Sequence, residues 1–277
     1  MTRDISEFSG TPWRDIADQI PQRARAVPTM LKAEEQALYF WIARDWAKGA
    51  GAIVDLGCFA GGSTARLAAG AEAAGYAAEI HAYDRFSANE KTKENTLYPQ
   101  GVAPFEGEDI RPLAERLLAP WADMIALYPG DLLQSRWHGG PIEVLAVDAA
   151  KSARAADRIA DRFFPALIPA GALIVQQDFL HRRQPWLIAQ MHLLAGAAVP
   201  VAFCAHDCVA FLVTEQIDRD RLAAARVEHL DDDALIGILT EAAESPALAP
   251  VADRIAGAIH AVRANPGERR AWAFGRA

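Results

Sequence analysis

Short apolar runs alternate with amphipathic stretches through the middle of this chain. The apolar runs predict strands at residues 52–56, 79–84, 124–128, 142–148, 172–176, 199–205 and 208–213. Helical spacing fills the gaps and predicts helices at residues 63–75, 153–167 and 185–194. Strand-then-helix units build a parallel sheet with helices on both faces, and the last two strands form an antiparallel hairpin. We therefore predict an α/β, doubly wound, Rossmann-like and mostly parallel seven-stranded sheet with an antiparallel last strand.

The two ends of the chain lack this alternation and are expected to be helical. Residues 32–48 predict a helix whose apolar stripe includes Leu38, Trp41, Ile42 and Trp46. The region after residue 214 is helical and charged, and it ends in a basic, loop-like tail. We predict three parts: a helical cap at 1–50, a core at 51–214 and a helical extension at 215–277.

Composition narrows the class of protein. The chain has 277 residues, 52% of them apolar, which is enough for a sizeable core. Its net charge of -8 argues against a nucleic-acid partner, because an acidic surface repels phosphates. The three cysteines are few, and their number is odd, so they are a poor basis for a disulfide framework. The start lacks the apolar region of a signal peptide, and polar residues interrupt the longest apolar stretch. We expect a cytoplasmic enzyme that binds no membrane; monomer and homo-oligomer both remain open.

The first predicted strand leads into a glycine turn and then a helix. Gly57 and Gly61 allow a tight turn and a close approach of backbone to a ligand, and the following helix offers unpaired N–H groups. The two glycines are four residues apart with Phe59 between them, so the G-x-G-x-x-G pattern of nicotinamide nucleotide sites is not met.

The Asp-x-Gly-x-x-x-Gly pattern that starts at Asp55 resembles motif I of class I S-adenosylmethionine (SAM)-dependent methyltransferases. Its Gly-Gly-Ser-Thr ending is similar to the branch of macrocin-type O-methyltransferases and cephalosporin hydroxylase-like proteins. The resemblance implies that Asp55, Gly57, Gly61 and Ser63 hold the methionine half of SAM. Two more acids follow predicted strands, and the resemblance places the SAM ribose at Asp84 and the adenine amine near Asp131.

A second group of polar residues follows the fourth and fifth predicted strands. Asp148-x-x-Lys151 resembles the site of metal-dependent O-methyltransferases that act on catechols and caffeoyl-CoA. The resemblance implies that Asp148 and Asp178 bind Mg²⁺ and that Lys151 is the base. Gln177 stands where these relatives carry a second carboxylate, and an amide oxygen is a weaker ligand for a hard cation. His181 is an alternative base.

These patterns predict a SAM-dependent O-methyltransferase that acts on a small hydroxylated molecule. One alternative is a protein of the same fold that binds SAM without transferring a methyl group, such as a partner subunit, because Gln177 departs from the relatives. Another is an oxidoreductase that uses a nicotinamide nucleotide. The long connection at residues 85–120 is expected to close over the substrate.

Overall fold

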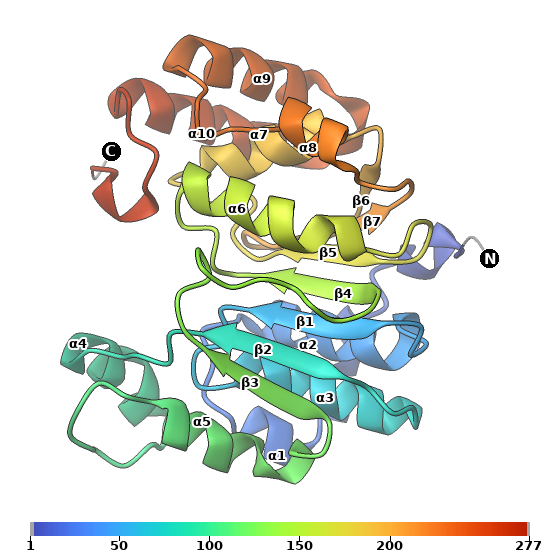
Figure 1. Ribbon diagram of the computed structural model, residues 1–277, viewed down its shortest axis with the longest axis vertical. Helices are drawn as coiled ribbons and strands as arrows, with labels where there is room; N and C mark the ends of the chain where they lie inside the picture. The colour runs from blue at the N-terminus through green and yellow to red at the C-terminus, as the bar shows by residue number, and fades with distance from the viewer. Residues whose placement is uncertain (1–2, 276–277) are drawn as a thin grey trace. The chain divides into compact units, whose positions relative to one another are not determined.

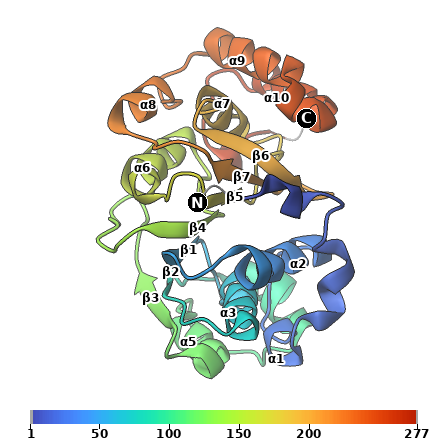
Figure 2. The same cartoon turned by 90° about the vertical axis from the view of Figure 1, so that its right-hand side faces the viewer.

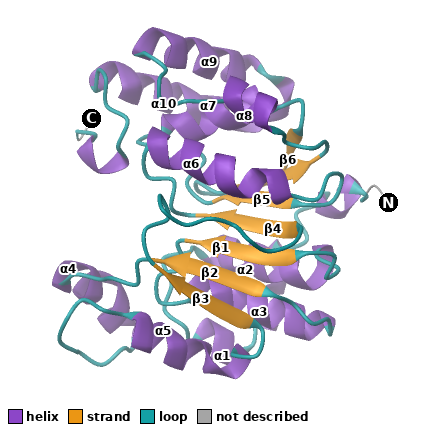
Figure 3. Ribbon diagram, in the orientation of Figure 1, coloured by secondary structure: helices purple, strands orange, loops and turns teal. Residues whose placement is uncertain are grey.

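The computed structural model describes residues 3–275 and contains the predicted sheet. Its strands are β1 (Ala52–Leu56), β2 (Ile80–Asp84), β3 (Ile125–Pro129), β4 (Ile142–Val147), β5 (Leu173–Gln176), β6 (Ala198–Phe203) and β7 (Val209–Val213). Their order is β3-β2-β1-β4-β5-β7-β6, and Figure 3 draws them in orange. Strands β1, β2 and β3 pair in parallel, whereas β7 runs antiparallel to both β5 and β6. The predicted fold class is confirmed.

The chain forms two compact units, which are described separately. The first comprises residues 4–135 and 139–145, and the second comprises residue 3, residues 136–138 and residues 146–275. The division into cap, core and extension stays a prediction. Within residues 3–275, no helix combines the length and the apolar content that a bilayer crossing requires.

The first unit builds its helices around β1 and β2. They are α1 (Gln22–Arg25), α2 (Ala33–Trp41), α3 (Gly62–Ala74), α4 (Glu90–Thr92) and α5 (Arg111–Leu118). Shorter helical turns lie at Ile5–Phe8, Arg14–Gln19, Ile42–Trp46, Lys93–Leu97, Tyr98–Gln100 and Ala119–Trp121. Helices α2 and α3 pack on each other and cover one face of these strands (Figures 1 and 2). The helix predicted at 32–48 is present, although its last turn is π-helical.

The connection between β2 and β3 is a folded structure with its own core. Phe86, Leu97 and Ile110 are buried together with Cys58 from the loop that follows β1. Lys93 is fully buried, and its Nζ donates to the carbonyl oxygens of residues 105 and 107, both at 2.9 Å. The packing against Cys58 joins residues 85–120 to the loop between β1 and α3, so the segment supports that loop. Its expected closure over a substrate stays a prediction.

The described part of the second unit contains five helices and three short 3-10 turns. The helices are α6 (Ala153–Phe163), α7 (Pro185–Leu193), α8 (Arg219–Ala224), α9 (Asp232–Glu244) and α10 (Ala252–Ala264). The 3-10 turns at Phe164–Ala166, Pro246–Val251 and Ala271–Ala273 complete it. Ser152 caps α6 as predicted, since its Oγ accepts a hydrogen bond from the Ala155 N–H at 3.1 Å. Helices α9 and α10 lie side by side and both pack on α7 (Figure 1).

Candidate functional site

The loop between β1 and α3 has the tight geometry that its glycines predict. Gly57 and Gly61 have φ angles of 98° and 94°, a region that favours glycine. The Gly57 N–H donates to the carbonyl of Tyr83 on β2 at 2.8 Å and extends the β1–β2 ladder, and the Gly61 N–H donates to the Cys58 carbonyl at 2.8 Å and closes the turn. A Cβ atom on Gly61 would approach the side chain of Leu118 to 2.7 Å. The backbone therefore favours glycine at both positions, and packing against Leu118 adds to this requirement at Gly61.

Asp55 and Ser63, which were both predicted to bind cofactor, contact each other. The fully buried Oδ2 of Asp55 accepts hydrogen bonds from Ser63 Oγ and Thr64 Oγ1, both at 2.7 Å. Burial raises the pKa of Asp55 to about 6, although the two hydroxyl donors oppose this shift. The carboxyl group thus fastens the first turn of α3 to β1 and holds the glycine turn in place.

Asp84, the last residue of β2, reaches the same loop. Its Oδ2 accepts the Phe59 N–H at 2.9 Å and its Oδ1 accepts the Phe86 N–H at 2.7 Å. Burial raises the pKa of Asp84, and the backbone donors partly offset this effect. A carboxylate can accept about four hydrogen bonds, so this side chain keeps the capacity to accept from a ligand. Phe59 itself has a φ of 52°, a strained value for a residue other than glycine.

Asp131 lies just beyond β3 and is connected to the end of β2. The preceding Gly130 donates its N–H to the backbone carbonyl of Asp84 at 2.9 Å. The Asp131 Oδ1 accepts the Leu133 N–H at 2.9 Å, and its Oδ2 lies 3.3 Å from an Arg85 nitrogen. The structure therefore brings Asp131 to the same edge of the first unit as Asp84.

Arg66 belongs to the support of this loop and was missed by the sequence analysis. Its buried Nη1 donates to the carbonyls of Val27 and Gly62 at 2.8 and 2.9 Å, and its Nη2 donates to Gln36 Oε1 at 2.9 Å. Burial lowers the pKa of Arg66 to about 10. An arginine within an alanine-rich helix was the available signal. This guanidinium joins the amino-terminal segment to the first turn of α3.

In the second unit, three predicted residues form one ionic cluster. The Nζ of Lys151 lies 2.5 Å from Asp148 Oδ1 and also pairs with Asp178 Oδ2. Gln184 Nε2 donates to the same Asp178 oxygen at 2.7 Å. Gln184 was not predicted from the sequence, because it lies six residues beyond Asp178 in a segment without helical spacing.

The charges of this cluster favour a protonated lysine. Burial disfavours the charged form of Lys151, but Asp148 and Asp178 outweigh it and raise the lysine pKa. Burial alone would raise the pKa of Asp178, yet Lys151 and Gln184 bring it below its usual value. This setting does not favour the neutral lysine that a general base requires.

The donor set of this cluster does not fit a Mg²⁺ site. The Lys151 ammonium lies between the two carboxylates, Asp148 and Asp178, and neutralises charge that a cation would need. Within the described part of the chain, no group of three or more His, Cys, Asp or Glu side chains could hold a metal ion. The predicted metal role of these two acids is therefore unsupported.

His181 lies in the turn that follows Asp178. Its backbone N–H donates to the Asp178 carbonyl at 3.0 Å, and its ring nitrogen Nδ1 accepts a hydrogen bond from the backbone N–H of Arg183 at 3.3 Å. With Nδ1 as an acceptor, a neutral imidazole carries its proton on Nε2. Nε2 is then a hydrogen-bond donor in this arrangement.

Comparisons with known proteins support the fold. No protein-family model matches the sequence, and no curated protein matches it either. The chain is similar to the structure of the O-methyltransferase NovP, with 13% identity and a TM-score of 0.53 over 76% of this chain and 96% of NovP. It is also similar to the SAH-bound methyltransferase PaMTH1 of Podospora anserina, with 13% identity and a TM-score of 0.49 over 76% and 92% of the two chains. At this identity, the first likeness establishes a shared fold.

Proposed function

We propose that this protein is a SAM-dependent O-methyltransferase that acts on a small hydroxylated molecule. The observation that carries the proposal is the Gly57–Gly61 turn, in which the Phe59 N–H donates a hydrogen bond to the carboxylate of Asp84. A strand-end carboxylate beside a glycine turn and the start of a helix suits a ligand with a ribose diol and an anionic group. The fold shared with NovP, itself an O-methyltransferase, agrees with this function.

The first unit would bind the cofactor. SAM supplies an electrophilic methyl group when it is bound. In our proposal the Gly57 and Gly61 backbone contacts its methionine part, Asp84 accepts hydrogen bonds from the ribose, and Asp131 lies near the adenine amine. Asp55 keeps the turn in shape by holding Ser63 and Thr64.

The second unit would act on the acceptor. A protonated Lys151, oriented by Asp148, would donate a hydrogen bond to the acceptor oxygen and favour its deprotonated form. This role suits a hydroxyl that is already acidic, such as a phenol with a pKa of about 10. His181 is the alternative base, a role that requires its Nδ1 to give up the Arg183 contact. Methyl transfer also depends on alignment of the acceptor oxygen behind the methyl carbon.

Calorimetry with SAM, S-adenosylhomocysteine and NAD tests the cofactor. We expect both sulfur nucleosides to bind and NAD not to bind. Binding of NAD alone would favour the oxidoreductase and contradict the proposal. Turnover is then followed as release of S-adenosylhomocysteine across a panel of phenols, catechols and aliphatic alcohols. Tight cofactor binding without turnover on the whole panel would favour a partner subunit.

A further inference from the structure

The carboxy-terminal tail pairs with the loop that carries Lys151. The Ala271 N–H donates to the Lys151 carbonyl at 2.9 Å, and the Ala153 N–H donates to the Arg269 carbonyl at 3.0 Å. These two bonds form an antiparallel bridge on either side of residue 152. The tail is therefore a backbone partner of the segment between β4 and α6, rather than the loose end that the sequence suggested.

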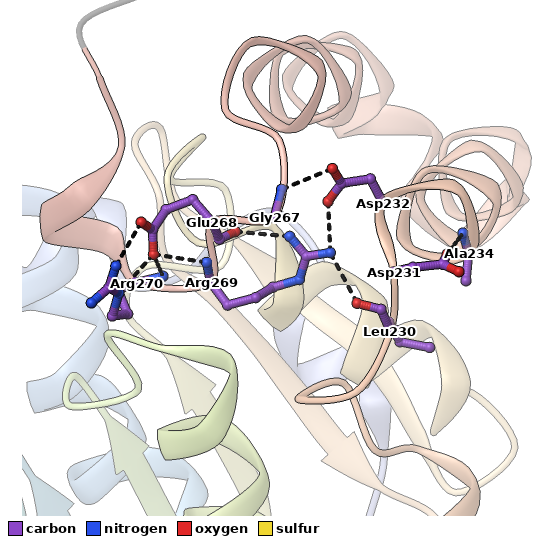
Figure 4. A network of polar contacts seen from close by, with 8 residues as sticks. All are labelled: Leu230, Asp231, Asp232, Ala234, Gly267, Glu268, Arg269 and Arg270. Atoms are coloured by element: carbon purple, nitrogen blue, oxygen red, sulfur yellow. Dashed lines mark hydrogen bonds and ion pairs between the residues drawn. The ribbon is translucent and has the colours of Figure 1, made fainter.

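Arg269 attaches this tail to the start of α9. Its Nη2 donates to Asp232 Oδ1 at 2.7 Å and to the Leu230 carbonyl at 2.9 Å (Figure 4). The other Asp232 oxygen accepts the Gly267 N–H at 2.9 Å. Only 15% of the Arg269 side chain is exposed, so this is a partly desolvated, charge-assisted anchor.

Glu268 sets the direction in which the tail leaves this anchor. Its Oε1 accepts the N–H groups of Arg269 and Arg270, both at 2.9 Å, and both of its oxygens contact the Arg270 guanidinium (Figure 4). With its backbone N–H groups held on one carboxylate, the tail has little freedom before it reaches Lys151.

A second anchor lies on the far side of the bridge. Phe274 is buried and packs edge-on against Trp186, with ring centroids 6.2 Å apart. The indole Nε1 of Trp186 donates to the Ala150 carbonyl at 2.8 Å. The tail is thus connected to the chain on both sides of Lys151: to Ala150 through Trp186, and directly to Ala153.

We propose that Arg269 is a positioning residue for Lys151. By fixing the tail on Asp232, it holds the Lys151 carbonyl and so keeps the ammonium between Asp148 and Asp178. The importance of Lys151 for the acceptor rests on the proposed function, whereas its positioning by the tail does not. The test therefore measures the accessibility of Lys151 itself, and not the methyl-transfer activity.

Three variants weaken the tail, at two different positions. Arg269→Ala removes the anchor, and Arg269→Lys keeps a single charge for Asp232. Ala271→Pro removes the N–H that reaches Lys151 and leaves the anchor intact. Proline is tolerated there because Ala271 is the first residue of a 3-10 turn and the preceding Arg270 is extended, at φ -130° and ψ 120°. Arg263→Ala, at an exposed arginine near the end of α10, is the matched control.

The measurement is the rate at which acetic anhydride acylates Lys151, quantified by peptide mass spectrometry, together with hydrogen exchange of the peptide that contains Ala153. Loss of one hydrogen bond between the tail and the Lys151 segment raises the population of the state in which that segment is open by about fivefold. We expect about fivefold faster acylation and exchange in Ala271→Pro and Arg269→Ala, a smaller change in Arg269→Lys, and wild-type rates in Arg263→Ala.

Wild-type rates at Lys151 in a folded Arg269→Ala variant would overturn the proposal. If that variant fails to fold, wild-type rates in a folded Ala271→Pro variant would overturn it. Equal increases in the Arg263→Ala control would overturn it as well. Both readings are made without SAM or acceptor. A wild-type protein that transfers no methyl group would therefore refute the proposed function and leave this result in place.

Discussion

Replacement of Asp84 by alanine is the sharpest test of the cofactor site. The side chain carries two backbone hydrogen bonds, from Phe59 on the loop and from Phe86 beyond β2. In the proposed complex it also accepts hydrogen bonds from the ribose hydroxyls. The substitution therefore acts on the free protein and on the complex, and the two effects have to be measured separately.

The expected magnitudes follow from these contacts. Unpaired ribose hydroxyls in a partly buried site cost roughly 1–3 kcal/mol, which corresponds to a loss of affinity of about 5- to 150-fold. In the free protein, two backbone N–H groups lose an acceptor, but the burial cost of the carboxylate is also removed. We expect a net loss of about 1 kcal/mol in the free energy of unfolding and a fall in Tm of about 2–4 °C.

Calorimetric titration with S-adenosylhomocysteine gives the affinity, and thermal unfolding without ligand gives the stability. Asp123→Ala removes an exposed carboxylate just before β3 and should change neither quantity. A folded Asp84→Ala protein that binds the ligand within twofold of wild type would refute the assignment of Asp84 to the ribose.

Three further predictions concern the charged groups. Lys151→Met should lower turnover by about 10²-fold or more and leave the affinity for S-adenosylhomocysteine unchanged, because in the proposal Lys151 donates to the acceptor oxygen and does not contact the cofactor; normal turnover would remove Lys151 from the mechanism. Asp55→Asn keeps an oxygen for both hydroxyl donors but cannot ionise. The raised pKa of Asp55, about 6, means that the wild type loses stability as pH rises from about 4 to 6, while the variant does not. Urea unfolding across this range should show the variant gaining up to roughly 3 kcal/mol over wild type, and parallel pH profiles would contradict the assignment. Dialysis against EDTA should leave turnover unchanged, because the Lys151 ammonium already neutralises the carboxylates of Asp148 and Asp178. Activity that is lost on dialysis and then restored by Mg²⁺ would contradict this prediction.

The strands were predictable because their signals are local. Strand β1 has the predicted bounds, and each of the other strands lies within two residues of them at both ends. These strands are apolar runs bounded by glycine, proline or polar residues, so their type does not depend on distant contacts. The Ser152 cap was likewise predictable, because a serine before a helical stripe is a local signal.

The detailed roles of site residues were harder to predict, because they depend on contacts between distant parts of the chain. The sequence places Asp148, Lys151 and Asp178 at strand ends, but the raised lysine pKa arises only once both carboxylates meet one ammonium. The role of the tail depends on a bridge between Lys151 and Ala271, which are 120 positions apart in the sequence. Neither hydropathy nor turn propensity contains information about such a pairing.

The buried guanidinium of Arg66 limits how far this protein can be truncated at its amino terminus. Its acceptors include the carbonyl of Val27 and the amide of Gln36, both of which precede the sheet. An expression design that begins after Gln36 would leave a cation enclosed beside the glycine turn with most of its acceptors gone, at a cost of several kcal/mol. Removal of these first residues would thus take away the support of the glycine turn, and an affinity tag is better joined to the intact segment through a cleavable spacer than used to replace it.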